Sequence, residues 1–204
     1  MEAVETLRLV LEHELRLSLD YHVELIVHPV GVNWRERHRT PRSQALAVHE
    51  SLMQPGPFEG RLIQVADLAV TLPGLLGPVP AGRAVSVTSR IYDDERTFVG
   101  HLAIMNLHPV GFRSTDELCQ ALQTVCGEFQ GLLLASGRFH HYYGFRLLDS
   151  SSWLRFLAQF LMPCTLVSPR YVGHSLYRGF CALRLNKAGP YKAVVPHVVR
   201  RVWT

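Results

Sequence analysis

The chain has 204 residues, of which 48% are hydrophobic and 19% are charged. These values are ordinary for a folded soluble protein with one domain or two small lobes around a shared core. The formal net charge of +4 permits an anionic partner without requiring one. No apolar run approaches the roughly 20 residues that cross a bilayer, and glutamates interrupt the apolar residues near the start, so neither a membrane span nor a signal peptide is expected.

The first half of the chain, residues 1–97, is expected to form an N-terminal α/β lobe. Val4, Leu7, Leu11 and Leu15 recur at helical spacing, whereas the residues from 21 to 28 alternate like a strand. The predicted elements are a helix over 2–18, a strand over 21–28, an arginine-rich polar loop over 33–42, a short helix over 43–53, and strands over 61–71 and 84–92, joined by a turn region rich in proline and glycine over 73–82.

The second half, residues 98–204, has a clearer order of elements. Ser114 and Glu117 form a capping box that begins a helix, and Leu118 and Leu122 lie on its apolar face. A second helix is expected to bury Trp153, Leu154, Leu157, Phe160 and Leu161. The predicted elements are a strand over 98–107, the helix from 114, strands over 131–135 and 139–147 with a turn at 136–138, the second helix capped within 150–152 and ended by Pro163, and a strand over 180–185.

The order of these elements is βαββαβ, which is typical of a ferredoxin-like, or RRM-like, unit. The predicted fold class is therefore α+β, with this unit packed on the smaller N-terminal α/β lobe in one compact structural domain. Helices are expected to cover one face of the sheet, and the other face is expected to be open to the N-terminal half.

The cysteines indicate the redox environment. None of the four has the C-x-x-C spacing of a zinc site. Cys119 and Cys126 lie seven residues apart on one predicted helix face, which suits core thiols. We therefore expect a reducing, cytoplasmic location.

Three segments in the last third of the chain carry the functional signal. Ser136–Gly144 reads Ser-Gly-Arg-Phe-His-His-Tyr-Tyr-Gly, Pro169–His174 reads Pro-Arg-Tyr-Val-Gly-His, and Cys181–Leu185 reads Cys-Ala-Leu-Arg-Leu. In a ferredoxin-like unit the first strand, the central hairpin and the approach to the last strand meet on the open face. Phosphoryl transfer with two metal ions needs acidic residues there, together with donors that hold the phosphates.

These segments and their order resemble the archaeo-eukaryotic primase superfamily, which includes the primase-polymerases, over roughly residues 98–200. The resemblance implies an acidic pair at the end of the first strand, a Ser-x-His type motif on the hairpin that holds the incoming nucleotide, and a further Asp before the last strand. On this basis Ser136, Arg138 and either His140 or His141 are expected to bind a nucleotide. His141 is favoured because it shares a strand face with Phe139.

The positions at which the family carries acids are occupied by other residues here. Asn106 and His108 stand in place of the acidic pair, and Ser168 stands in place of the later Asp. Neutral oxygens of Asn and Ser coordinate metals weakly, and His suits softer metals than Mg²⁺. These three are therefore interpreted as degenerate catalytic positions, and we expect no metal site and no cofactor.

Mg²⁺ or Mn²⁺ is expected only if the site is active. Acids at the turn over residues 93–95 (Asp-Asp-Glu) are one alternative source of ligands, although the same residues suit a solvated turn. A metal held by His101, His108 and His141 is another alternative, on weak spacing evidence.

Four further side chains extend the expected nucleotide or nucleic-acid site. Arg184 lies in an apolar strand and needs a partner, which is either a phosphate or a structural carboxylate. His174, Lys187 and Lys192 are nearby in sequence, and His174 also suits a structural role near a turn. Lys187 and Lys192 are the only lysines among the 21 Lys and Arg residues of the chain. The many arginines suit phosphate recognition, although genomic base composition explains the same bias.

The leading hypothesis is a primase-like protein that binds nucleic acid or a nucleotide and serves as a catalytically degenerate accessory subunit beside a catalytic protein partner. One alternative is an active primase or nucleotidyltransferase with a rearranged metal site. Another is a protein-interaction scaffold with no nucleotide function. DNA, RNA and free nucleotides are equally compatible with the sequence.

Overall fold

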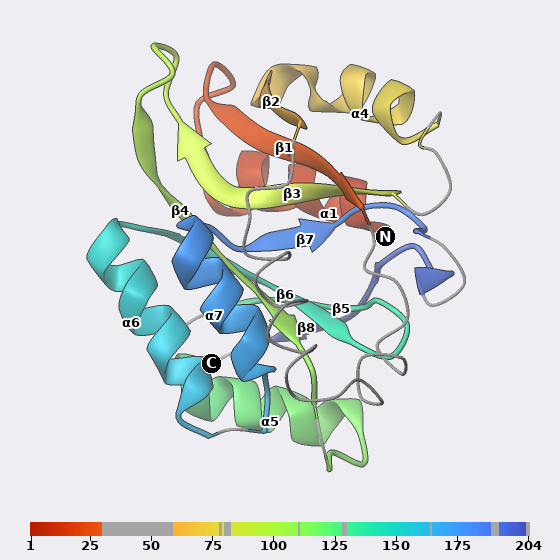
Figure 1. Ribbon diagram of the computed structural model, residues 1–204, viewed down its shortest axis with the longest axis vertical. Helices are drawn as coiled ribbons and strands as arrows, with labels where there is room; N and C mark the ends of the chain where they lie inside the picture. Colours follow the sequence, from red (N-terminus) through yellow and green to blue (C-terminus); the bar gives the residue numbers. More distant parts are fainter. Residues whose placement is uncertain are drawn as a thin grey trace, which may run out of the picture.

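In a computed structural model the chain forms an α+β fold around an antiparallel eight-stranded sheet (Figure 1). The structure describes residues 1–29, 59–77, 79, 83–109, 111–127, 130–163, 165–188 and 192–202. Within these ranges the helices are α1 (Ala3–Arg8), the π-helical η1 (Leu9–Glu14), the 3-10 helix η2 (Val65–Asp67), α4 (Leu68–Leu76), α5 (Thr115–Cys126), α6 (Ser150–Leu161) and α7 (Pro169–Arg178). The strands are β1 (His22–Pro29), β2 (Glu59–Gln64), β3 (Arg83–Tyr92), β4 (Phe98–Leu107), β5 (Gly131–Ala135), β6 (His140–Leu148), β7 (Ala182–Arg184) and β8 (His197–Val202).

The sheet has the order β2-β1-β3-β4-β6-β5-β8, and β7 pairs with β3 beside this path. β3 and β4 are paired only near their connecting turn, from Arg90↔His101 to Tyr92↔Phe98. Farther along β3, β4 is no longer paired with it, and β7 pairs with β3 instead, with Ser86 opposite Arg184. The two halves of the sheet therefore diverge from one shared turn, and β7 lies where they separate.

The C-terminal unit follows the predicted order through β4, α5, β5, β6 and α6. β4 has the predicted bounds, and the side chain of Ser114 accepts a hydrogen bond from the Glu117 backbone N–H and so caps α5. α6 packs on β4 and β6, where Trp153 stacks on His101 with 4.3 Å between ring centroids. Helices thus cover one face of this half of the sheet.

The N-terminal helix packs through one apolar stripe. Leu7, Val10 and Leu11 are fully buried, and their spacing of three and four residues places them on one side of a helix. Helical structure ends at Glu14, earlier than predicted, and Arg16 has a left-handed φ of 50°. The Arg201 side chain of β8 pairs with Glu14 and connects this helix to the far edge of the sheet.

The predicted strand over 61–71 is wrong in its second half. The chain leaves β2 at Gln64 and enters η2 and then α4, which runs through Pro73. Val65, Leu68 and Leu72 are buried at intervals of three and four, so the apolar period of this segment is helical. The β-branched residues in between favoured a strand, but Val70 points to solvent.

Four other expectations are corrected. The segment from Pro169 to Arg178 is a helix that was not predicted. The strand predicted over 180–185 is β7, which pairs with β3, and β8 adds a further strand beside β5. Asp149, rather than a serine after it, caps α6 by accepting a hydrogen bond from the Ser152 backbone N–H. Leu154 is half exposed because it lies on the outer face of α6.

Some sequence predictions concern residues that the structure does not describe, and others concern the cysteines and membrane spans. The polar loop over 33–42, the helix over 43–53 and Cys164 lie outside the described ranges. Cys119 and Cys126 are buried on α5, as predicted for core thiols. Among the described helices, none is both long and apolar enough to cross a membrane.

Candidate phosphate-binding pocket

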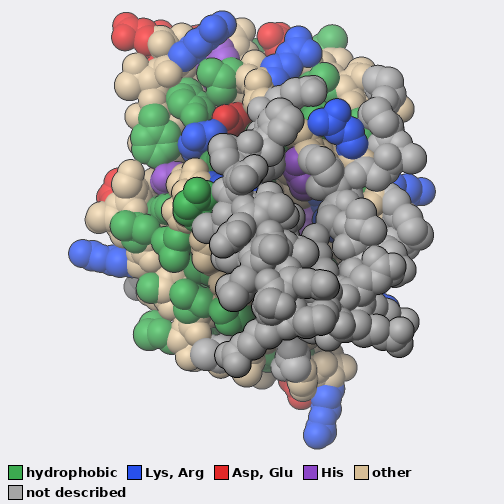
Figure 2. Space-filling model, viewed as in Figure 1, with side chains coloured by type: hydrophobic (Ala, Val, Ile, Leu, Met, Phe, Trp, Pro, Cys, Tyr) green, Lys and Arg blue, Asp and Glu red, His purple; other side chains and the backbone are tan. Residues whose placement is uncertain are grey.

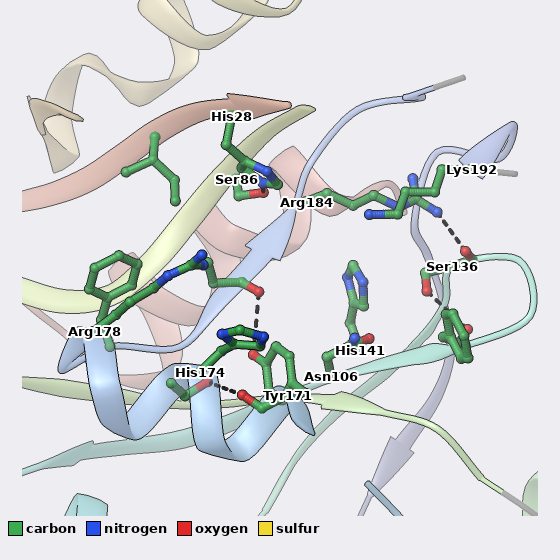
Figure 3. A pocket seen from close by; sticks show the side chains of 15 residues that line it. His28, Ser86, Asn106, Ser136, His141, Tyr171, His174, Arg178, Arg184 and Lys192 are labelled. Carbon is green, nitrogen blue, oxygen red and sulfur yellow. Dashed lines mark hydrogen bonds between the residues drawn. The ribbon is translucent and has the colours of Figure 1, made fainter. Parts of the chain in front are cut away.

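A pocket of about 270 Å³ lies where the two halves of the sheet diverge (Figure 3). It is bounded by β1, β3 and β7 on one side, by β4, β6 and the β5–β6 turn on another, and by α7. The lining residues are Ile26, His28, Ser86, Asn106, Ser136, Phe139, His141, Tyr171, His174, Ser175, Arg178, Phe180, Ala182, Arg184 and Lys192. The first strand of the unit, its central hairpin and β7 therefore do meet at one site, as expected from the sequence.

The β5–β6 turn forms one end of the pocket. The backbone N–H and the hydroxyl of Ser136 both donate to the carbonyl of Phe139, at 2.9 and 3.0 Å. Gly137 has a φ of +94°, a conformation that glycine adopts without the steric cost of a side chain. This tight turn places His141, the second residue of β6, inside the pocket.

His141 is a buried polar side chain with unused hydrogen-bonding capacity. Its side chain is 3% exposed, and its Nδ1 atom has no hydrogen-bond partner among the described residues. Burial, and then the nearby charges of Arg184 and Lys192, lower the pKa of His141 well below its ordinary value. The imidazole is therefore neutral at pH 7 and has a ring nitrogen available to a ligand.

Arg184 connects the sides of the pocket through backbone carbonyls. Its Nη1 atom donates to the carbonyls of Asn186 (2.7 Å) and Val194 (2.6 Å), and its Nη2 atom donates to the carbonyl of Ser136 (2.5 Å). Burial lowers its pKa to about 10, so the guanidinium stays charged at neutral pH. Among the described residues, the partners of this strand arginine are thus backbone carbonyls and not a carboxylate.

The pocket is cationic. Arg184 and Lys192 lie at the end near Ser136, and Arg178 lies toward the other end on α7 (Figure 3). Burial, and then the charge of Arg184, lower the pKa of Lys192, and burial also lowers the pKa of Arg178. None of the described lining residues is an Asp or Glu, so a bound anion would stabilise the charged forms of these three side chains.

The N-terminal half and α7 supply pocket residues that sequence reasoning missed. His28 on β1 forms a hydrogen bond of 2.9 Å with the hydroxyl of Ser86 on β3. On α7, Tyr171 and Arg178 were missed, and they share one face with the predicted His174 by their spacing of three and four residues. The signal for α7 was in the sequence, because Pro169 stands at its first turn and Gly179 ends it with a left-handed φ of 74°.

The Glu24 carboxylate lies near the pocket but is already paired. Arg90 donates to both of its oxygens, and Thr88 donates to one of them at 2.8 Å. The Arg90 guanidinium also lies 4.6 Å from the centre of the Phe180 ring, which lines the pocket. Glu24 therefore belongs to a structural ion pair and is not a pocket-lining acid.

The structure separates the predicted site residues into two groups. Those that line the pocket are Asn106, Ser136, His141, His174, Arg184 and Lys192. Those that do not are His108, Arg138, His140, Ser168 and Lys187.

The residues outside the pocket have other positions. Arg138 and Lys187 are exposed, and His140 lies on the opposite strand face from His141. His108 packs edge-on against Phe139, and Ser168 begins α7 as its N-cap residue.

The donor set does not fit a pair of Mg²⁺ ions. Asn106, Ser136 and His141 offer neutral donors, and the nearby guanidinium and ammonium groups repel divalent cations. Asp93, Asp94 and Glu95 form an exposed turn away from the pocket lining, where the Asp93 carboxylate accepts from the Thr97 backbone N–H. In the described part of the chain, no group of three or more His, Cys, Asp or Glu residues is arranged to hold a metal.

Comparison with known proteins identifies one family. A family model described as AEP-like, archaeo-eukaryotic primase 1D-like, matches residues 72–197, which is more than half of the chain. The matched segment contains all of the lining residues except Ile26 and His28. No curated protein and no solved structure gives a significant match.

Proposed function

The chain belongs to the archaeo-eukaryotic primase 1D-like family, and we propose that its pocket binds the phosphate of a nucleotide or nucleic acid without carrying out metal-dependent phosphoryl transfer. The observation that carries this proposal is the charge of the pocket. Arg178, Arg184 and Lys192 line it, together with three histidines, and none of its described lining residues is a carboxylate. Such a site favours an anion and disfavours a divalent cation.

The placement of the free donors supports a phosphate near the β5–β6 turn. Arg184 already gives three N–H groups to backbone carbonyls, so its main contribution to a ligand is its charge. Lys192 lies at the same end of the pocket, and a lysine ammonium has three donors that can turn toward a phosphate. His141 adds a ring nitrogen that has no partner in the described residues.

The apolar part of the lining suits the rest of a nucleotide. Ile26, Phe139 and Phe180 line the same pocket as the cationic groups, and ligand pockets commonly combine apolar walls with a few polar groups. A pocket of about 270 Å³ is at the small end of such sites. We therefore assign it to a single nucleotide unit, either free or at one position of a strand.

Because the described pocket lining has no carboxylate, the chain would act as an accessory subunit. A two-metal mechanism needs acids that hold both ions against the phosphates, and the resemblance assigns the family's acidic positions to Asn106, His108 and Ser168, none of which is an acid. The accessory role would be to hold a nucleotide or strand beside a catalytic partner protein.

Two lysines of the chain provide a matched test of this proposal. Lys192 lines the pocket, whereas Lys187 is exposed outside it. Binding is measured by fluorescence anisotropy with a labelled nucleotide and with labelled single-stranded, duplex and primer–template DNA and RNA over a salt series. We expect saturable binding of at least one probe that weakens with salt, is reduced about tenfold or more by Lys192→Met, and is nearly unchanged by Lys187→Met.

Two outcomes would contradict the proposal. The first is equal loss of affinity in the two lysine variants, or no saturable binding of any probe at low salt. The second is sustained primer synthesis or extension by pure protein with Mg²⁺ or Mn²⁺, since that would require metal ligands that the described lining residues do not supply.

A further inference from the structure

The outer face of α6 carries an apolar stripe. Leu154 is 50% exposed and Met162 is 75% exposed, and Ala158 is exposed halfway between them. Their spacing of four residues places them in one stripe. A surface helix normally turns charged or polar side chains to solvent, so this stripe departs from the usual pattern.

The neighbouring helix α7 extends this apolar surface. Leu176 and Tyr177 are 44% and 60% exposed. α6 and α7 contact each other and run side by side in Figure 1, and hydrophobic side chains gather over the same region in Figure 2. We call Leu154, Ala158, Met162, Gly173, Leu176 and Tyr177 the outer surface of α6 and α7.

Gly173 is an unusual residue for this position. It lies in the interior of α7, where glycine is a poor helix former compared with alanine. A Cβ atom added there would meet no described atom within 4 Å, so packing within the described part of the chain does not require a glycine. The missing side chain instead lets another backbone approach α7 closely.

The charge of this surface indicates which kind of partner would bind to it. From Ser150 to Arg178 the sequence contains no Asp or Glu, and Arg155 and Arg170 are exposed on the two helices. A second copy of this chain would bring like charges together. A polyanionic nucleic acid would suit the arginines but would leave Leu154 and Met162 without apolar partners. An acidic amphipathic segment satisfies both features.

We propose that the outer surface of α6 and α7 docks an acidic, amphipathic segment of a partner protein. Its apolar side chains contact Leu154, Met162 and Leu176, and its carboxylates lie near Arg155 and Arg170. The other face of α7 lines the pocket, so the docked segment lies beside the ligand site. This inference does not depend on what the pocket binds.

The first test uses a photo-crosslinking amino acid at the position of Tyr177 in the full chain, in its native cells, with the same group at the exposed Leu19 as a control. We expect adducts specific to position 177 whose crosslinked peptides, sequenced by mass spectrometry, are net negative and amphipathic. Nucleic-acid or lipid adducts, peptides of this chain, adducts shared with position 19, or no adducts would each overturn the proposal.

The second test measures affinity for the segment so identified, made as a synthetic peptide. We expect Leu154→Glu with Leu176→Glu to weaken binding at least tenfold, and Arg155→Glu with Arg170→Glu to weaken it in a salt-dependent way. Arg113→Glu, a charge reversal at an exposed loop position, is the matched control and should change affinity less than twofold.

Gly173→Ala separates docking from folding. A better helix former at this position should raise the midpoint of thermal unfolding, while the added methyl group should weaken peptide binding about fivefold or more. Unchanged peptide affinity in the alanine variant, or a matching loss of pocket binding to the labelled nucleotide in the surface variants, would contradict a separate docking surface.

Discussion

The two sides of the pocket differ in how their polar side chains are used. On the side of β1, β3 and α7, several polar groups are already hydrogen-bonded: His28 to the Ser86 hydroxyl, and the Tyr171 hydroxyl to the Ala182 backbone carbonyl. On the side of β4 and β6, the buried His141 has a ring nitrogen with no partner among the described residues. We interpret the first side as a fixed frame, and under the proposed function the His141 nitrogen on the second side is the group available to a ligand.

Arg184 should give the largest effect, because it connects the two sides. Replacing it by methionine leaves the carbonyls of Ser136, Asn186 and Val194 without their buried donor. We expect the free energy of unfolding to fall by about 3–5 kcal/mol, measured by urea denaturation.

Arg138→Met is the control for Arg184→Met, because Arg138 is exposed on the adjacent turn, and it should change stability by less than about 0.5 kcal/mol. A similar small change for both variants would show that the carbonyl contacts of Arg184 contribute little.

A second prediction concerns His101, a buried histidine that has partners. Its ring lies against Trp153, and its Nδ1 atom is 3.0 Å from the Ser89 hydroxyl. Burial, and then the charge of Arg90, lower the pKa of His101 to about 4. The unfolded chain, with a histidine pKa near 6.5, therefore binds more protons than the folded chain between these values.

Stability should fall as the pH is lowered from about 6.5 to 4, and His101 should account for about 2–3 kcal/mol of that loss. Urea denaturation at several pH values checks this, and His101→Gln should flatten the curve. His108→Gln is the control, since His108 is exposed. Identical curves for the wild type and His101→Gln would contradict the assignment.

A third prediction concerns the Glu24–Arg90 pair on β1 and β3. It tests whether this side of the pocket contributes to the stability of the fold and not to ligand affinity. Glu24→Gln removes the charge that Arg90 contacts with short, partly buried hydrogen bonds. We expect a loss of about 1–2 kcal/mol in unfolding free energy and little change in ligand affinity.

Glu12→Gln, in the more exposed Arg8–Glu12 pair of the N-terminal helix, is the matched comparison and should cost less than about 0.5 kcal/mol. Equal losses in the two variants, or an affinity loss specific to Glu24→Gln, would contradict the assignment of Glu24 to the frame.

The smallest expected effect is on the pH dependence of ligand affinity. The pKa of His141 is low in the free protein because of burial and the nearby Arg184 and Lys192 charges. A bound phosphate would stabilise the protonated ring and raise this pKa, so ligand binding takes up a proton and tightens as the pH falls toward the raised pKa.

The tightening should reach up to about tenfold within the pH range in which the protein stays folded. It is measured as the difference between the wild type and His141→Asn, because the ligand's own phosphate also titrates. A difference that is constant with pH would show that His141 does not take up the proton.

The sequence predicted elements whose signals are local. The apolar run of β4 and the capping box of Ser114 and Glu117 gave the correct strand and the correct start of α5. α7 was missed although Pro169 and Gly179 mark its ends, because Pro169–His174 was interpreted as a motif before the last strand. Val65–Leu76 was misassigned because its β-branched residues obscured a helical period of buried residues.

The pocket could be predicted only in part, for a physical reason. Ser136 and His141 lie on one hairpin, so a family motif locates them together. His28 and Ser86 meet through a pairing of strands 58 residues apart, and no local pattern indicates that contact. The carbonyl partners of Arg184 depend likewise on the conformation of loops far from the strand.

The most direct test of the central claim compares two adjacent histidines. His141 lies in the pocket, whereas His140 points to the other side of β6. NMR spectra of the histidine side chains are recorded while a nucleotide is added in the presence of EDTA. We expect a saturable shift of the His141 signals that is much larger than that of His140 and is lost in Lys192→Met. No shift at His141, or a shift that appears only when Mg²⁺ is supplied, would contradict a metal-independent phosphate site.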